Sequence, residues 1–314
     1  MRIKELDYLK GVMIILVITF HLVYFEHLYP YAKQVVYTFH MPVFLVISGY
    51  LMNINKNWRA FMLTIAGLAI PYAVMESGYI VMASLLPINE HIDHLTLGLF
   101  FDKLLLHPLG PYWYLHTLIL CGVTYYCVFT RNAAMNALTR FMLMGLVYYL
   151  FSHVLGVLAL SSAVYFLAGV VLRQSNTGFM RFFQPSLLAI VAFVLLIMQA
   201  QYLNSSTLGG ILIVYLAISS CLYSYKYAER RFRNTILFLG RNSLLLYVFS
   251  PIFTILCKQM VPYLTFDKSG ILFLAASLTV CISGCLAIGW LMDRLRISPL
   301  FFMKQRVVSS LSSD

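Results

Sequence analysis

The sequence predicts an all-α, polytopic integral membrane protein with about ten transmembrane helices. Of its 314 residues, 61% are hydrophobic and only 11% are charged, and the mean hydropathy is +0.84. Soluble domains contain about 45–50% apolar and about 25% charged residues, so a soluble fold of this chain would lack polar residues for its surface. The apolar residues form runs close to the roughly 20 residues that a helix needs to cross a bilayer.

These runs divide the chain into ten expected spans. They cover residues 9–25, 34–53, 60–86, 111–130, 141–155, 160–172, 185–201, 208–228, 242–261 and 269–291. Residues 1–293 therefore form one membrane domain, and residues 294–314 form a short basic cytoplasmic tail. The six cysteines lie inside apolar runs without CxxC spacing, which is typical of packing residues and not of disulfides or a metal site.

The distribution of positive charge predicts the orientation. With the N-terminus in the cytoplasm, all but four of the 22 Lys and Arg residues lie on the inner side, as the positive-inside rule requires. The four on the outer side are Lys33, Lys103, Lys258 and Lys268. Ten spans then place both termini in the cytoplasm.

The net charge of +11 does not indicate nucleic-acid binding, because the orientation of the chain in the membrane and its attraction to anionic lipid explain it. A phosphate-rich substrate on the cytoplasmic side stays an alternative, because it could bind the closely spaced Arg230, Arg231 and Arg233.

Five ionisable side chains are expected at membrane depth, where burial in hydrocarbon is costly and calls for a partner or a function. They are His21, His40, Glu76, His116 and His153. The first four fall in the outer half of their spans, which favours one shared polar cavity over scattered hydrogen bonds between helices. An imidazole can take a proton from a hydroxyl, and Glu76 could orient it. The histidines lack HExxH or i, i+4 spacing, so we expect no metal site.

Lys10 and His21 form a second pattern. Eleven residues make about three helical turns, so both side chains project from one face of the first helix, roughly 16 Å apart along its axis. The simplest interpretation is a snorkelling lysine and an unrelated histidine. The functional interpretation is a route through the membrane that binds an anion at its inner mouth and does chemistry inside.

Backbone-breaking residues also favour a cavity. Pro42 and Gly49 in the second span and Pro71 in the third are expected to kink or open those helices. Trp113, next to two tyrosines, belongs to an interfacial aromatic belt or forms the wall of a sugar site.

Several segments resemble the acyltransferase 3 family of membrane proteins. The N-terminal RIKELDYLKGVMIILVITFH carries Lys10 and His21 in the spacing of that family's R/K-x10-H signature. Further segments are similar to family motifs in the same order: FHMPVFLVISGYL (Phe39–Leu51), WRAFMLTIAGLAIPY (Trp58–Tyr72), GPYWYL (Gly110–Leu115), YFLAGVVLR (Tyr165–Arg173) and LGRNSLLLYVFSP (Leu239–Pro251). The last motif carries Ser250 where many members have histidine, so we assign that position no role.

The resemblance implies transfer of an acyl group, most often acetyl, from cytoplasmic acyl-CoA to hydroxyls of cell-surface or lipid-linked glycans. It implies that His21 is catalytic, as a base or an acyl carrier, and that Lys10 is essential on the CoA side. Acyl-CoA is a polyanion, so we expect it to dock near Lys10, Lys56 and Arg59. His40 or Glu76 would orient His21.

Substrate contacts complete the expected site. Ser48 would stabilise the oxyanion, and Trp113 and His116 would contact the substrate. Acyl-CoA is a co-substrate, and no permanently bound cofactor is expected. The resemblance implies a bacterial inner (plasma) membrane and a type that consists of the membrane domain alone, and the oligomeric state is not predicted. The alternative function is a proton-coupled transporter or flippase of a glycan intermediate, for which a buried Glu with several histidines is equally suited.

Overall fold

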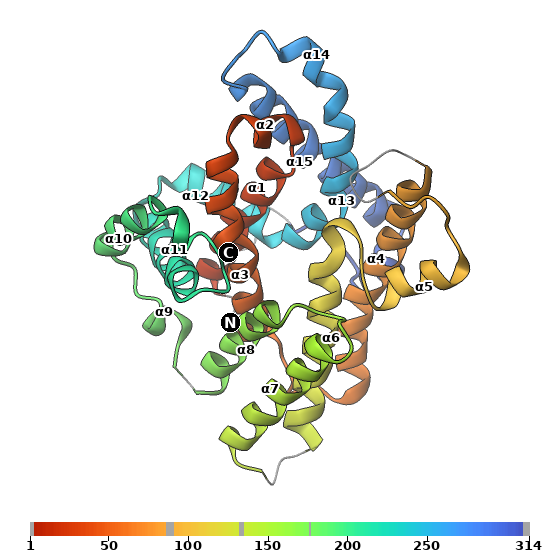
Figure 1. Cartoon of the computed structure of the whole chain (residues 1–314), viewed down its shortest axis with the longest axis vertical. Helices are drawn as coiled ribbons and strands as arrows, with labels where there is room; N and C mark the ends of the chain where they lie inside the picture. Colours follow the sequence, from red (N-terminus) through yellow and green to blue (C-terminus); the bar gives the residue numbers. More distant parts are fainter. Residues whose placement is uncertain (1–2, 86–90, 132–134, 176, 310–314) are drawn as a thin grey trace. The chain divides into compact units, whose positions relative to one another are not determined.

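The computed structural model describes residues 3–85, 91–131, 135–175 and 177–309, and every regular element in these residues is a helix (Figure 1). The all-α prediction is therefore confirmed. The chain divides into two compact units. The first contains residues 1–44, 178–298 and 305–314, and the second contains residues 45–177 and 299–304.

The first unit holds both ends of the chain. Its elements are α1 (Lys4–Phe20), α2 (Val23–Leu28), the first part of α3 (Pro30–Leu51), α9 (Phe179–Phe182), α10 (Leu187–Ile197), η2 (Ala200–Tyr202), α11 (Leu208–Tyr227), α12 (Arg230–Arg241), α13 (Ser243–Leu256), η3 (Cys257–Met260), α14 (Val261–Leu264) and α15 (Ile271–Arg294). Helix α1 packs along α12 and also contacts α11, α13 and α15, so it lies in the middle of this unit.

The second unit begins within α3. Its elements are the end of α3, α4 (Trp58–Leu85), α5 (Leu97–Leu105), η1 (Gly110–Tyr112), α6 (Trp113–Arg131), α7 (Ala137–His153) and α8 (Leu160–Gln174). Helix α6 contacts α4, α7 and α8. A short helix, α16 (Ser298–Phe301), follows α15 and leads into the second part of this unit.

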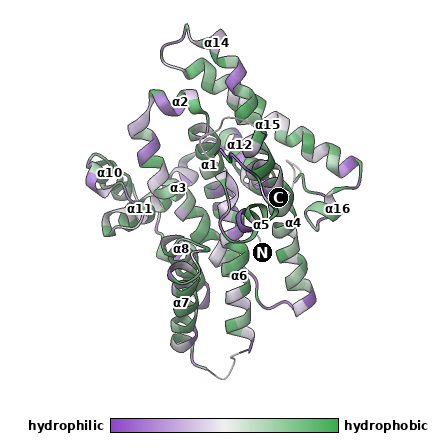
Figure 2. Ribbon diagram, turned by 45° about the vertical axis from the view of Figure 1, so that its right-hand side comes forward, coloured by the Kyte–Doolittle hydropathy of each residue, from purple (hydrophilic) through white to green (hydrophobic). Residues whose placement is uncertain are grey.

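Six helical stretches of the described chain are long and apolar enough to cross a membrane. They are α3, α4, the stretch Leu97–Arg131, α11, the stretch Ser243–Leu264 and α15. Helices α8 and α10 are shorter apolar helices. Figure 2 shows hydrophobic residues along most of the length of α4, α6, α7 and α15. A multi-pass membrane protein is thus confirmed, while the total of ten spans and the orientation of the termini stay predictions.

The first expected span is not one helix over residues 9–25. Helix α1 starts at Lys4 and ends at Phe20, and the backbone of His21 leaves the helical conformation (φ −102°, ψ 0°) before α2 begins at Val23. Both the backbone N–H and Nδ1 of His21 lie within hydrogen-bond distance of the Val17 carbonyl oxygen. The imidazole is thereby a second partner of the Val17 carbonyl, in addition to the backbone N–H.

The second and third spans are not opened at their prolines, and the expected kinks there stay predictions. Helix α3 runs through Pro42, and α4 runs through Pro71. Gly49 instead lies at a close contact between α3 and α8. A Cβ atom at this position would overlap the carbonyl oxygen of Phe166 in α8. A Cβ atom on Gly169 of α8 would in turn overlap the carbonyl oxygen of Val46. Small residues allow this close approach of helices in membranes.

A second pair of glycines joins α1 to α12. A Cβ atom on Gly11 would overlap the carbonyl oxygen of Ile236, and one on Gly240 would overlap that of Asp7. Helix α12 buries Ile236 and Leu237 against α1 while Arg230 and Arg231 stay exposed. We call this region, with the start of α1, the α12 end of the first unit.

The opposite end of the first unit, which we call the α2 end, gathers three connections. The Tyr29 hydroxyl donates to the carbonyl oxygen of Ser269 (2.9 Å), the Tyr31 hydroxyl donates to that of Ile197, and the side chain of Leu28 lies against Gly270. The distribution of charge in the sequence predicts that these three connections lie on one side of the membrane. Their meeting at one end of the unit agrees with that grouping.

The chain after α16 returns to the α12 end. Asp293 at the end of α15 accepts hydrogen bonds from the Ser298 hydroxyl and from the amides of Val307 (2.8 Å) and Val308 (3.1 Å). The amide of Ser309 donates to Asn242 Oδ1 at 2.8 Å. These bonds hold residues 307–309 against α13 and α15.

We expect Asp293→Ala to release this segment. Hydrogen bonds to a carboxylate contribute roughly 1.5–3 kcal/mol each, so trypsin should cleave after Lys304 or Arg306 at least about tenfold faster. Asp267→Ala is the control, since Asp267 accepts from the hydroxyl of Ser269 and from the amides of Leu272 and Ser269 at the other end of α15, bonds that hold its pKa below the ordinary value. Equal cleavage rates in wild type and Asp293→Ala, measured by mass spectrometry, would contradict the prediction.

Candidate functional site

His21 lies where α1 ends in the first unit. Its Nδ1 is 2.7 Å from the carbonyl oxygen of Val17, one helical turn earlier. The side chain is partly exposed and follows the last helical residue, Phe20. The end of the helix thus determines where this imidazole points.

His40 lies within α3 and repeats the same contact. Its Nδ1 is 2.7 Å from the carbonyl oxygen of Val36, and the side chain is buried. A carbonyl oxygen only accepts hydrogen bonds, so Nδ1 carries a proton in both histidines. In the neutral ring, Nε2 then holds the lone pair and is the basic nitrogen. Both histidines are therefore in the tautomer that a general base with a free Nε2 requires.

Tyr37 connects the two histidines. Its ring centroid is 6.1 Å from that of His21 and 5.1 Å from that of His40. Its hydroxyl donates to the carbonyl oxygen of Phe20 at 3.0 Å, which ties α3 to the end of α1. Sequence reasoning did not single out Tyr37. Its position three residues before His40, on the same helix face, was the available signal.

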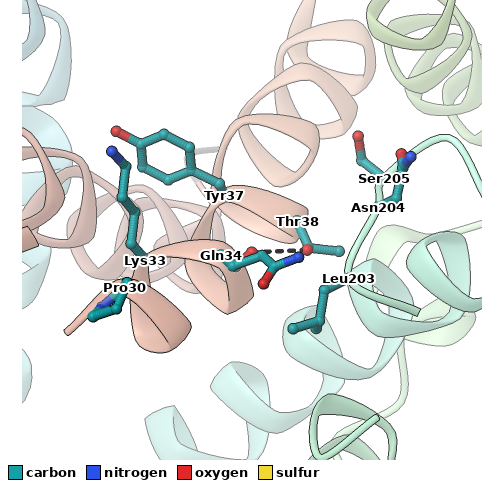
Figure 3. Close-up of a pocket in the computed structure, with 8 residues that line it drawn as sticks. All are labelled: Pro30, Lys33, Gln34, Tyr37, Thr38, Leu203, Asn204 and Ser205. Carbon is teal, nitrogen blue, oxygen red and sulfur yellow. Dashed lines mark hydrogen bonds between the residues drawn. The ribbon is translucent and has the colours of Figure 1, made fainter. Parts of the chain in front are cut away.

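A groove of about 420 Å³ opens beside Tyr37 at the α2 end (Figure 3). The first turns of α3 and the segment between η2 and α11 form its walls. They contribute Pro30, Lys33, Gln34, Tyr37 and Thr38 on one side and Leu203, Asn204 and Ser205 on the other. Because Tyr37 belongs to both, the groove and the histidine pair are adjacent.

Lys10 lies nearer the α12 end of the same unit. Its Nζ is 2.8 Å from Oδ1 of Asp7, whose side chain is buried. Asp7 was not among the predicted residues, although its i, i+3 spacing to Lys10 was a signal. The ion pair fixes the ammonium group on α1.

In the second unit, Ser48 and Trp113 lie near one tyrosine. Ser48 Oγ is 2.8 Å from the Tyr114 hydroxyl, and the ring centroids of Trp113 and Tyr114 are 6.4 Å apart. Tyr114 is buried, while Ser48 and Trp113 are partly exposed. The structure thus brings together two of the three residues expected to contact substrate.

Glu76 and His116 bind backbone groups of one segment of the second unit. Glu76 Oε1 accepts from the Leu109 amide (2.6 Å), and His116 Nε2 donates to the Leu105 carbonyl oxygen (2.9 Å). Tyr72 donates to the carbonyl oxygen of Leu104 at 2.7 Å. These three bonds anchor the connection between α5 and η1. This anchoring supports a structural role for Glu76 and His116.

Two predicted cations flank the start of α4. Lys56 Nζ donates to the hydroxyl of Thr64 at 2.8 Å, and its backbone carbonyl oxygen accepts from Tyr126. Arg59 is exposed in the first turn of α4. His153, expected at membrane depth, is exposed at the end of α7 and stacks on Tyr149 (centroids 4.4 Å apart). In the described part of the chain, no group of three or more His, Cys, Asp or Glu side chains is placed to hold a metal ion.

The fold and these contacts define a helical, multi-pass membrane protein in which two histidines, each bonded through Nδ1 to a carbonyl oxygen, lie beside a polar groove. The chain belongs to the acyltransferase 3 family, whose model, described as an acyltransferase domain, matches residues 3–290. This match confirms the resemblance carried by the motifs and identifies a membrane acyltransferase. Neither the curated proteins nor the solved structures with which the chain was compared gave a match.

Proposed function

We propose that this protein is a membrane O-acyltransferase that moves an acyl group, most often acetyl, from cytoplasmic acyl-CoA to a hydroxyl of a cell-surface or lipid-linked glycan. One observation carries the proposal: the Val17 carbonyl holds His21 with Nε2 as its basic nitrogen, one tyrosine away from a polar groove. Family membership supplies the acyl transfer. The proposed location is a bacterial plasma membrane, with the α12 end towards the cytoplasm.

In the proposed step, His21 acts as a general base on the hydroxyl of the acceptor. Nε2 of His21 takes the proton of the acceptor hydroxyl while the hydroxyl oxygen attacks the thioester carbonyl carbon. The new O–C ester bond forms, the C–S bond breaks, and the proton passes from His21 to the leaving CoA thiolate. If His21 is instead an acyl carrier, Nε2 attacks the thioester carbonyl carbon, the N–C bond forms, the C–S bond breaks and CoA leaves as the thiolate. The acceptor hydroxyl then attacks the acyl group, the N–C bond breaks, and the hydroxyl proton neutralises the CoA thiolate. The protein thus gains the mass of one acyl group before the glycan does.

The other predicted residues have secondary parts in the proposal. His40 supports Tyr37 and through it the position of His21. Lys10, Lys56 and Arg59 are the proposed contacts of the CoA phosphates, while Ser48 and Trp113 remain proposed contacts of the reacting groups. Glu76 and His116 would act by anchoring the segment before η1.

Surface glycans of whole cells test the function. Mass spectrometry should show an O-acyl group that disappears in a deletion strain and returns with wild type but not with an expressed His21→Ala variant. The mass of that group identifies the acyl donor. If acylation is unchanged and glycan accumulates inside the cell, the protein is an exporter and the proposal is wrong.

We expect Lys10→Gln to raise the KM for acetyl-CoA about tenfold or more, because a charge-assisted contact to phosphate is lost. Lys10→Arg should keep most of the affinity, since it keeps the charge. Initial rates of the purified protein in nanodiscs, at varied acetyl-CoA, measure this effect. Lys258→Gln, an exposed lysine of η3, is the control for loss of charge alone. A loss of thermal stability with an unchanged KM would show that Lys10 serves only as the partner of Asp7.

A further inference from the structure

We infer that the groove beside Tyr37 is the binding site of the acceptor, and that it takes an uncharged sugar unit of the glycan. The inference rests on the proposed function and assigns its second substrate to named residues. The groove volume of about 420 Å³ falls in the usual range of ligand sites, roughly 300–1,000 Å³.

The chemistry of the walls fits a polyhydroxyl ligand. Amide and hydroxyl side chains, those of Gln34, Thr38, Asn204 and Ser205, line the groove, and the aromatic ring of Tyr37 lines it beside Lys33 (Figure 3). Side chains of this kind both donate to and accept from sugar hydroxyls. An aromatic ring beside them offers an apolar surface to the C–H face of a sugar.

The charge of the groove favours the acceptor over the donor. Lys33 is the single ionisable cation among the groove residues, and its Nζ is 3.0 Å from Glu26 Oε2 and 5.3 Å from the centroid of the Tyr37 ring. The pair leaves little net charge for the phosphates of acyl-CoA. A neutral, hydrogen-bonding ligand suits such walls better than a polyanion.

Two amide groups are available for a ligand. The side chain of Gln34 makes no hydrogen bond to another residue of the described chain. Asn204 Oδ1 accepts from the amide of Ser206 at 2.9 Å, which fixes the orientation of its side-chain amide. Nδ2 of Asn204 is therefore the free end, and it has no hydrogen-bond acceptor among the residues described.

The position of the groove fits an acceptor that is a chain of sugars. The groove lies at the α2 end, where the connections predicted to be extracytoplasmic meet. Tyr37 separates the groove from His21 by one aromatic ring. A sugar unit held in the groove would place a hydroxyl of its neighbour beside Nε2 of His21.

Kinetics of the whole protein in nanodiscs test the inference. The donor is radiolabelled acetyl-CoA, and the acceptor probe is surface glycan of the deletion strain after mild alkali has removed its esters. The variants are Gln34→Ala and Asn204→Asp, the second of which keeps the oxygen that bonds Ser206 but removes the amide donor. Gln201→Ala, an exposed glutamine three residues before Asn204 that bonds Gln199, is the matched control.

We expect each groove variant to raise the KM for glycan about three- to tenfold, with the KM for acetyl-CoA unchanged, and Gln201→Ala to behave as wild type. An unchanged glycan KM in a variant that combines Gln34→Ala with Asn204→Asp, or a rise in the acetyl-CoA KM instead, would overturn the groove assignment. Transfer by the wild type would still uphold the proposed function in that case. If wild type transfers no acetyl group, the proposed function fails and the assignment fails with it.

Discussion

Replacing His21 by glutamine is expected to lower acyl transfer at least a hundredfold in a protein that still folds. General acid–base catalysis by one side chain contributes about 10²–10⁴ in rate, and glutamine has no basic nitrogen to take its place. Its side-chain amide can still donate to the Val17 carbonyl oxygen, so the end of α1 should persist. Transfer of radiolabelled acetyl groups to alkali-treated glycan in nanodiscs measures the loss.

The chain supplies a matched control for this variant. His153→Gln changes an exposed histidine that stacks on Tyr149 in the second unit, and it should retain near-wild-type transfer. More than half of wild-type activity in His21→Gln would rule out His21 as the base. A fall in activity with an equal fall in melting temperature would indicate a structural role.

The glycine crossing of α3 and α8 should be the most sensitive packing contact of the second unit. Gly49→Ala and Gly169→Ala each place a methyl group on a carbonyl oxygen of the facing helix. Overpacking of this kind costs about 1–3 kcal/mol, and the two costs should not add, because both changes force the same two helices apart. We expect each variant to melt several degrees below wild type.

The buried cysteines provide the measurement. Cys121, Cys257, Cys281 and Cys285 are buried thiols, so a thiol-reactive dye reports their exposure as the protein in detergent is heated. Gly145→Ala in α7 is the control, since a Cβ atom there meets no atom within 4 Å. Alanine favours the helix there, so Gly145→Ala should melt at or above the wild-type temperature. Equal melting of all three alanine variants would show that the crossing is not tight.

The fold class followed from composition, because 61% hydrophobic residues leave few alternatives to helices in a bilayer. The end of α1 could not be predicted in this way. Apolar residues continue past His21, and hydropathy does not register an imidazole that bonds the carbonyl four residues earlier. Depth along each span grouped His21 with His40, and both rings lie beside Tyr37. The predicted cavity that these two share with Glu76 and His116 stays a prediction.

Estimates of depth did not predict that Glu76 and His116 form hydrogen bonds with backbone groups. Glu76 and His116 satisfy the amide of Leu109 and the carbonyl of Leu105, residues distant in sequence, and no pattern along one helix reveals such partners. The groove was missed for a similar reason. Gln34 and Asn204 are 170 positions apart, and only the packing of the first unit brings their segments together.

The structure explains why glycine occurs at three positions in the segments that resemble family motifs. Gly49, Gly169 and Gly240 each fall in a segment that resembles a family motif, and each allows backbone contact between two helices. These motif positions thus have a packing role, in addition to the chemical role that we propose for Lys10 and His21.

The shortness of several helices bears on the lipid around the protein. At about 1.5 Å per residue, the 17 residues of α1 extend about 25 Å and the 11 residues of α10 about 16 Å, against a hydrocarbon core of roughly 30 Å. Because the apolar side chains of α10 are largely exposed, we expect its negative hydrophobic mismatch to draw the headgroups inward and to thin the bilayer locally. In the proposed function, water and the acceptor would then reach His21 over a shorter distance, and we expect lipids with longer acyl chains to work against that approach.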